Sequence, residues 1–450
     1  MEYAAFGEKL REQLGDLREL LDRPGFGEGP ATIGAELELF LVDENGRPLP
    51  RNAETLEAMG DPRMVLELGR FNLEVNLTPL PLAGRPFEAL GAEIQETLVK
   101  VDAAVEGGGA VPIGILPTLA TGDFTRGSMS DENRYRALSR GIRRLRLEPF
   151  LVVVDDLELE VEDVILEAAN TSWQVHLRTP PGRFARLFNA AQLAIGPVLA
   201  ACGNSPLFLG RTLWEETRIA LMEEAADDRD VERRFRKDGR VTFGSDWVRE
   251  GAYELFERYV EDYDPVMPEI SDDGELRELR LHQGTIWQWN RPVYDPADGG
   301  HLRVEMRALP AGPSCADMAA NTAFLLGLTL SAAEHDLTGY AFGEAYQNFY
   351  RAAQRGLDAE LSWPGQEGTL PAADLVLRLL PQSRAALLAA GVVPSDADAA
   401  LGVIEQRVRL RRTGAVWQRA ALERFGGDAE ALVRRYRDLA LSGLPVHLWR

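Results

Sequence analysis

Several segments of the chain alternate between apolar and polar residues, a pattern that predicts β-strands with one buried face. The clearest segment is residues 33–42, which read IGAELELFLV. Successive side chains of a strand point to opposite faces, so Glu36 and Glu38 share one face. No lysine or arginine in the segment balances these two carboxylates, and they repel each other unless water or a bound cation lies over them. Taken alone, the segment is also typical of a half-exposed antiparallel strand with its polar face in water.

A second acidic segment is residues 64–79, which read MVLELGRFNLEVNLTP. Gly69 interrupts the alternation and divides the segment into two short predicted strands. Glu67 falls in the first of them, and Glu74 lies between two asparagines on the polar face of the second. A hairpin would bring both carboxylates beside the two acids of the first segment, although periodicity does not establish that pairing.

Three later segments alternate in the same way: residues 173–178, 284–292 and 301–313. His176 shares a polar face with an arginine, so metal ligation and a structural role are both open for this histidine. In the other two segments the alternation groups Thr285, Trp287, Trp289 and Arg291 on one face, and Arg303, Glu305 and Arg307 on another.

Helical spacing accounts for most of the remaining chain. It predicts an amphipathic helix over residues 1–24, helices over 84–106 and 183–202, and a largely helical chain beyond residue 315. Residues 111–118, VPIGILPT, are predicted to form a short buried strand. Six arginines fall within residues 128–147, where a solvated helix face is the favoured explanation and a phosphate contact from one or two of them is the alternative. The predicted fold class is α+β.

The composition of the chain argues against several classes of function. The chain has 450 residues, 45% of them hydrophobic, and a formal net charge of −22. Such an acidic protein lacks the basic patch that nucleic acids or anionic membranes require. We found no Walker-type phosphate loop, no signal-peptide pattern and no apolar run of membrane-spanning length, so a soluble cytoplasmic protein is expected. The two cysteines, Cys202 and Cys315, have no disulfide or zinc-site spacing and are expected to be buried.

The strands together predict a site for a nucleoside triphosphate. Carboxylates can hold divalent cations, the cations bridge phosphate oxygens, and arginine neutralises the charge of the transferred group. The chain carries no Ser/His/Asp or Cys/His signature of nucleophilic catalysis, and this chemistry does not need one.

Seven stretches, in order over about residues 31–330, resemble the glutamate–cysteine ligase family, in the branch that includes plant and many bacterial enzymes within the glutamine-synthetase-like superfamily. They are GAELELFLV, VLELGRFNLEVNLTPL, TSWQVHL, the following helix with NSPLFLGR, ETR, HQGTIWQWNRP and LRVEMRALPAG. The resemblance implies an antiparallel sheet funnel with flanking helices. It also implies a catalytic core over residues 1–330, and a helical C-terminal region over residues 331–450 that packs on the core.

The resemblance also implies roles for individual residues and ligands. Arg291 and Arg307 would face phosphate, and Arg218 would hold the carboxylate of the amino-acid substrate. ATP and Mg²⁺, or Mn²⁺, would be the cofactors, with these metal ligands: Glu36, Glu38, Glu67, Glu74, Glu305 and His176. His176 stands where some relatives have asparagine. The regulatory cysteines of the plant enzymes have no evident counterpart in this chain.

The reaction that the resemblance implies is the ATP-dependent joining of glutamate and cysteine into γ-glutamylcysteine through a γ-glutamyl phosphate. Three alternatives are open: a ligase that uses another amine or peptide acceptor, a phosphotransferase of the same superfamily, and a non-catalytic metal-binding scaffold. The five acids count against the scaffold. Trp287 and Trp289 stand where relatives usually have smaller or different residues, and they could reshape the substrate pocket. The sequence does not predict the oligomeric state.

Overall fold

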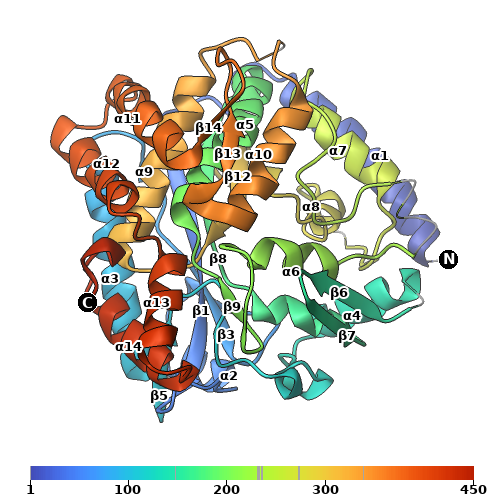
Figure 1. The fold of residues 1–450 in the computed structure, drawn as a ribbon. Coiled ribbons are helices and arrows are strands. Elements are labelled where there is room, and N and C mark those ends of the chain that lie inside the picture. The colour runs from blue at the N-terminus through green and yellow to red at the C-terminus, as the bar shows by residue number, and fades with distance from the viewer. Residues whose placement is uncertain (1, 147, 231–233, 235–236, 272–273, 338) are drawn as a thin grey trace.

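The structure is a computed structural model, and it describes residues 2–146, 148–230, 234, 237–271, 274–337 and 339–450. An eight-stranded antiparallel sheet forms its centre (Figure 1). Six strands follow the order β11-β12-β8-β1-β3-β2, and β4 and β5 also pair with β1. Their bounds are β1 (Thr32–Asp43), β2 (Met64–Leu66), β3 (Asn72–Asn76), β4 (Leu80–Pro81), β5 (Gly108–Val111), β8 (Ser172–Thr179), β11 (Asn290–Asp295) and β12 (His301–Pro310).

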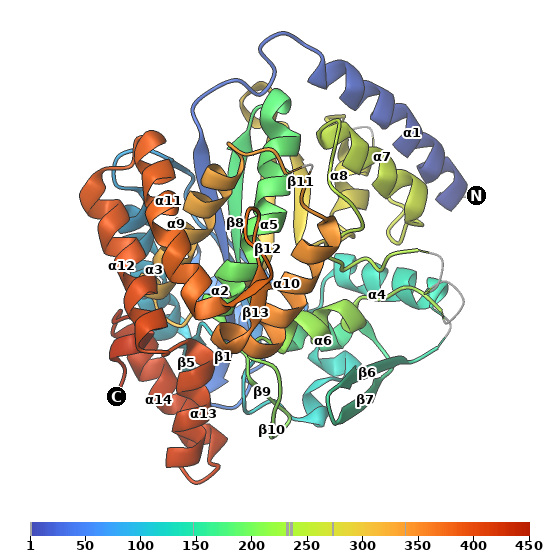
Figure 2. The same cartoon turned by 45° about the horizontal axis from the view of Figure 1, so that its top comes forward.

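Helices cover the apolar face of this sheet. Side chains on that face, such as Leu37, Val175 and Met306, are completely buried, as the alternation predicts. The covering helices are α3 (Pro86–Ala104), α5 (Phe184–Cys202) and α9 (Cys315–Ala332), with α11 (Ala372–Ala389) and α12 (Pro394–Arg409) packed outside them (Figure 2).

Two of the core helices are exceptions to the prediction that no apolar run has membrane-spanning length. Residues 181–202 and 315–332 are long and apolar enough to cross a membrane by length and composition alone. In each, 83% of the apolar window is buried inside the protein. Their apolar composition is therefore accounted for by packing in the core.

A second layer lies on the other side of the sheet, where Figure 1 shows α4, α6, β6 and β7 opposite α9, α11 and α12. A separate apolar cluster supports this layer and includes Tyr135, Ile142 and Val164. The elements on this side are α1 (Glu2–Leu21), α4 (Asn133–Leu145), β6 (Phe150–Val154), β7 (Leu157–Val161), the 3₁₀ helix η3 (Val164–Ala169), α6 (Arg218–Ala225), α7 (Ala252–Asp262) and α8 (Arg277–Gln283).

The chain beyond residue 315 is mainly helical, as predicted, with one small hairpin. It includes α10 (Phe342–Arg355), α13 (Gly414–Arg424) and α14 (Ala429–Leu441), and the hairpin pairs β13 (Glu360–Ser362) with β14 (Thr369–Pro371). The remaining elements are α2 (Asn52–Met59), β9 (Leu207–Phe208) and β10 (Arg211–Thr212). Leu37 of β1 and Leu375 of α11 belong to one apolar core, and the division at residue 330 stays a prediction.

Two predicted strands differ from the structure. Residues 284–289 form no strand, because Gly284 and Ile286 donate backbone hydrogen bonds to the end of α8 and make turns, and β11 begins only at Asn290. The strand predicted over 111–118 ends at Val111. Proline has no amide hydrogen to donate to a ladder, and Pro112 follows that residue directly.

Candidate active site

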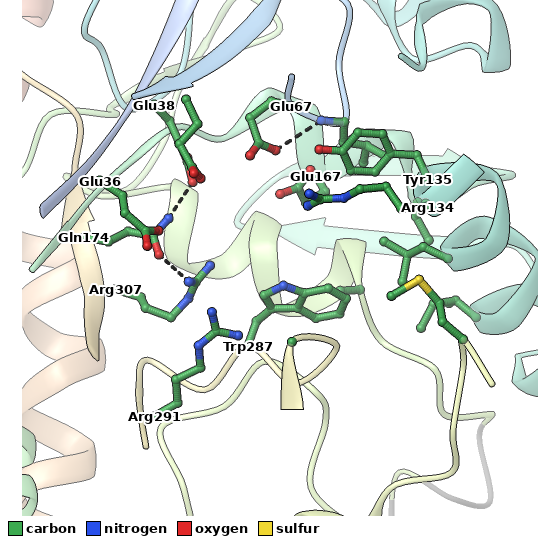
Figure 3. Close-up of a pocket in the computed structure, with 18 residues that line it drawn as sticks. Glu36, Glu38, Glu67, Arg134, Tyr135, Glu167, Gln174, Trp287, Arg291 and Arg307 are labelled. Atoms are coloured by element: carbon green, nitrogen blue, oxygen red, sulfur yellow. Dashed lines mark hydrogen bonds between the residues drawn. The ribbon is translucent and has the colours of Figure 1, made fainter. Parts of the chain in front are cut away.

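One pocket over the polar face of the sheet gathers most of the predicted site residues (Figure 3). Its lining includes six of the nine: Glu36, Glu38, Glu67, Glu74, Arg291 and Arg307. His176 and Glu305 lie beside it, within contact of Glu36. The ninth residue, Arg218, does not line the pocket. The assigned roles stay predictions, but the structure brings eight of the nine side chains together.

Strand register explains why these side chains meet. Glu38 pairs with Glu74 across β1 and β3. On the other side of β1, β8 places His176 opposite Gly34, and β12 places Glu305 opposite His176. Residues directly opposite each other in antiparallel strands carry side chains on the same face, about 5 Å apart. The sheet therefore concentrates acids from β1, β3 and β12, together with His176 from β8, on its polar face.

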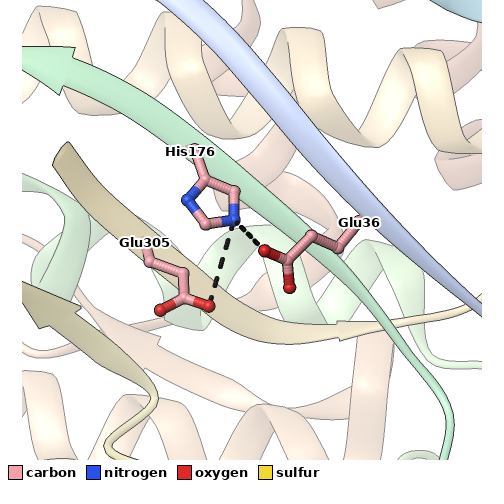
Figure 4. A group of neighbouring side chains, drawn as sticks. All are labelled: Glu36, His176 and Glu305. Atoms are coloured by element: carbon pink, nitrogen blue, oxygen red, sulfur yellow. Dashed lines mark ion pairs between the residues drawn. The ribbon is translucent and has the colours of Figure 1, made fainter. Parts of the chain in front are cut away.

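Glu36, His176 and Glu305 form the tightest group (Figure 4). The Nε2 atom of His176 lies 3.0 Å from a carboxylate oxygen of Glu36 and 3.9 Å from one of Glu305. One potential ligand atom from each residue lies within 4.8 Å of the others. Nδ1 of His176 is buried without a hydrogen-bond partner. Burial raises the pKa of Glu36, but the neighbouring His176 outweighs burial and leaves that pKa below its ordinary value.

A second group consists of carboxylates alone: Glu38, Glu67, Glu74 and Glu167. Burial and then repulsion from neighbouring acids raise the pKa of Glu74 and of Glu167 well above the ordinary value. The same two causes raise the pKa of Glu38 to about 7, although its carboxylate accepts hydrogen bonds from the Ser172 backbone N–H (2.6 Å) and the Gln174 amide (2.7 Å). Oxygen-only donor sets of this kind suit hard divalent cations such as Mg²⁺.

Glu305 holds the two predicted phosphate-facing arginines. It is completely buried and accepts hydrogen bonds from both guanidinium groups, at 3.1 Å from Arg291 Nη2 and 2.7 Å from Arg307 Nη1. Burial alone would raise the pKa of Glu305, but the two arginines reverse the shift and lower it strongly. Arg307 also donates to Gln174, which in turn donates to Glu38. The arginines are thereby fixed at the edge of the acid cluster.

Three pocket residues were not assigned from the sequence. Glu167 lies on the 3₁₀ helix η3, whose sequence has no alternation to mark it. Gln174 lies on the same polar strand face as His176, where alternation alone gives it no role. Arg134, from the arginine-rich helix, lines the pocket, and among the described residues it forms no ion pair. Most of the other arginines of that helix contact residues outside the pocket, such as Asp131 and Asp163, so the solvated-face interpretation holds for most of the run.

Arg218 does not line the pocket. It begins α6, is 2% exposed, and donates to Glu216 (3.1 Å) and to the carbonyl oxygen of Ala308. Burial lowers the pKa of Arg218 even though Glu216, and then Glu38, favour its charge. Its assignment to a substrate carboxylate stays a prediction.

The sheet with its acidic and arginine-lined polar face is that of a carboxylate–amine ligase with a glutamine-synthetase-like fold, as the sequence predicted. Residues 32–438 match the model of glutamate-cysteine ligase family 2 (GCS2), and the chain belongs to that family.

Solved structures share the fold at low sequence identity. A glutamate–cysteine ligase from Francisella tularensis in complex with AMP is 12% identical with a TM-score of 0.57, and the match covers 93% of this chain and 90% of that one. A bifunctional glutathione synthetase from Pasteurella multocida is also 12% identical, with a TM-score of 0.58, and the match covers 92% of this chain and 54% of that one. No curated protein matches the chain.

Proposed function

We propose that the protein is an ATP-dependent glutamate–cysteine ligase, which forms γ-glutamylcysteine through a γ-glutamyl phosphate. The observation that carries this proposal is a pocket in which five carboxylates lie with two arginines fixed by the buried Glu305. Family membership supports the ligase class. The similar fold solved with AMP supports an adenine nucleotide as the phosphate donor.

The donor set fits divalent cations, Mg²⁺ or Mn²⁺. Glu36, His176 and Glu305 would hold one ion, because Nε2 of the buried imidazole lies between the two carboxylates, 3.0 Å from Glu36 and 3.9 Å from Glu305. Glu38, Glu67 and Glu74 would hold further cations, since a bound cation would relieve the repulsion that contributes to their raised pKa values. Such ions bridge phosphate oxygens and neutralise the charge that develops during transfer.

The chain's own groups would supply positioning and electrostatic stabilisation. Arg291 and Arg307 keep N–H groups toward the pocket and would bind the transferred phosphoryl group. Arg218 would bind the α-carboxylate of glutamate. The amine of the acceptor would then attack the acyl phosphate and release inorganic phosphate. Effective concentration of the two reactants in one enclosed pocket would lower the barrier for this attack.

A second candidate is a ligase for another amine. Part of the pocket lining is apolar, and it is formed by Leu138, Ile142, Val164, Met267 and Trp287. A wall of this kind favours an acceptor with an apolar side chain over one with a small polar side chain. The nucleobase of ATP would be an alternative occupant.

The test is a screen of ATP-dependent phosphate release over pairs of amino acids and amines, with mass spectrometry of the products. Release that needs both glutamate and cysteine, with a product of the mass of γ-glutamylcysteine, would establish the proposed reaction. Release with a different acceptor would establish the second candidate. A phosphorylated product with no release of phosphate would instead identify a phosphotransferase.

A further inference from the structure

Trp289 contacts two predicted site arginines from outside the pocket. Its side chain is 2% exposed, and Cζ of Arg218 lies 5.5 Å from the centroid of its ring. Its carbonyl oxygen accepts a hydrogen bond of 2.8 Å from the backbone N–H of Arg307. The ring and the peptide group of one residue thus contact the residue proposed to bind glutamate and a residue proposed to bind phosphate.

The indole is itself fixed by a carboxylate. Oε1 of Glu223, on α6, accepts a hydrogen bond of 2.9 Å from Nε1 of Trp289 and one of 2.5 Å from the hydroxyl of Tyr350. Tyr350 belongs to α10, in the C-terminal helical region. The neighbouring Phe349 packs on the indole with its ring centroid 5.7 Å away. One oxygen atom therefore joins α6, α10 and the segment before β11.

We propose that Glu223 and Tyr350 are positioning residues, which fix the indole of Trp289 and through it hold Arg218 and Arg307 in place for ligation. Neither residue lines the pocket, so neither would touch a substrate. The inference rests on the proposed function, because that function gives the two arginines their roles. It assigns the C-terminal region a part in forming the active site, through α10.

The chemistry of Glu223 favours this role over simple packing. Burial raises its pKa to about 7, against the hydrogen bonds from Tyr350 and Trp289, while Glu224 adds repulsion and Arg229 adds attraction. Even a half-buried carboxylate carries a desolvation cost, and an apolar side chain would pack at such a position without that cost. The carboxylate instead supplies one acceptor for two donors, which a leucine cannot do and a glutamine can.

The experiment compares Glu223→Leu, Glu223→Gln and Tyr350→Phe with a matched control, Tyr340→Phe. The control also removes one tyrosine hydroxyl, which is bonded to Ser362 at 2.7 Å and to the Asn348 amide at 3.3 Å and, among the described residues, forms no hydrogen bond with Glu223. For each full-length variant, phosphate release is measured against glutamate concentration, and hydrogen–deuterium exchange is measured on the peptide that contains Arg307. The exchange measurement needs no turnover.

Misplacement of the two arginines in Glu223→Leu should raise the Michaelis constant for glutamate and lower kcat, together by about 10-fold or more in kcat/KM. Exchange at Arg307 should be faster than in wild type. Tyr350→Phe should also lower kcat/KM and speed exchange at Arg307, but by less than Glu223→Leu does. Glu223→Gln should restore both toward wild type, and Tyr340→Phe should leave both unchanged.

Normal kinetics and normal exchange in Tyr350→Phe and Glu223→Leu would overturn the inference, even if the melting temperature fell. If Glu223→Leu does not fold, Tyr350→Phe against Tyr340→Phe decides the question in the same way. Failure of the proposed function looks different: wild type would release no phosphate with any amino-acid pair. Faster exchange at Arg307 in Tyr350→Phe alone would then still support the connection from α10 to β12.

Discussion

Glu38 and Glu74 lie directly opposite each other on β1 and β3. Neither forms an ion pair within the described part of the chain. Glu38 accepts hydrogen bonds from Ser172 and Gln174, and Glu74 accepts one of 2.9 Å from the amide of Asn76. Like charges directly opposite each other destabilise a sheet, and in the pocket both side chains are also half-buried. The pair therefore costs stability in the metal-free protein, and a bound cation would reverse that cost.

The first prediction follows for Glu74→Gln. The variant removes a charge from the cluster, so the metal-free protein should be as stable as wild type or more stable. ATP turnover should fall by orders of magnitude, and Mg-ATP should raise the melting temperature less than in wild type, because ligand stabilisation scales with affinity.

Thermal melts with and without Mg-ATP, together with turnover on the same preparation, check this prediction. Glu158→Gln is the matched control, since Glu158 is an exposed glutamate of β7 and exposed substitutions usually change stability by less than about 0.5 kcal/mol. Wild-type turnover in Glu74→Gln would show that Glu74 is a solvated side chain of the strand face and not a metal ligand.

Glu305→Gln should have the opposite effect on stability. Glu305 is completely buried and balances two arginines, so its neutralisation leaves two largely buried guanidinium groups without their carboxylate. Breaking such a pair typically costs about 3 kcal/mol or more. Turnover should be lost as in Glu74→Gln. Urea unfolding of the two variants side by side measures the contrast, and equal stability of both would contradict the distinct surroundings assigned to these carboxylates.

Arg218→Lys tests the residue that the structure places outside the pocket. Lysine keeps the positive charge beside Glu216 but loses the planar group that can bind a carboxylate with two parallel hydrogen bonds. The Michaelis constant for glutamate should therefore rise much more than that for ATP. An unchanged constant for glutamate would leave Arg218 as a structural partner of Glu216 and Ala308 only.

The alternation of residues was sufficient to predict the sheet and most of its acids. A period of two places Glu36 and Glu38 on one face of their strand whatever the tertiary packing. The pairing of β1 with β3, which periodicity could not establish, adds Glu74 to that face. Glu167 could not be found in this way, because its 3₁₀ helix imposes no such period. Alternation predicts a strand at Trp289, but the chain makes turns after α8 and β11 begins only at Asn290. The contact of Trp289 with Glu223 depends on packing between segments 66 residues apart.

The last prediction concerns the pH dependence of stability and uses Glu223. Its pKa is about 7 in the folded protein and 4.5 in its ordinary state, so the folded protein holds this proton more tightly than the unfolded chain. The stability that Glu223 contributes is fully present below about pH 4.5 and is lost as the pH rises toward 7. At about 1.4 kcal/mol for each pKa unit, that loss is up to about 3 kcal/mol.

Glu223→Gln cannot ionise but keeps an oxygen that accepts from both Tyr350 and Trp289. The free energy of unfolding of this variant should therefore rise relative to that of wild type between pH 5 and pH 8, which means that the variant becomes relatively more stable. Subtracting wild type removes the contributions of the other buried acids, which both proteins share. Urea unfolding at several pH values in this window measures the difference. A difference that stays constant with pH would show that the Glu223 carboxyl titrates in its ordinary range and that its surroundings exert no net cost on the charge.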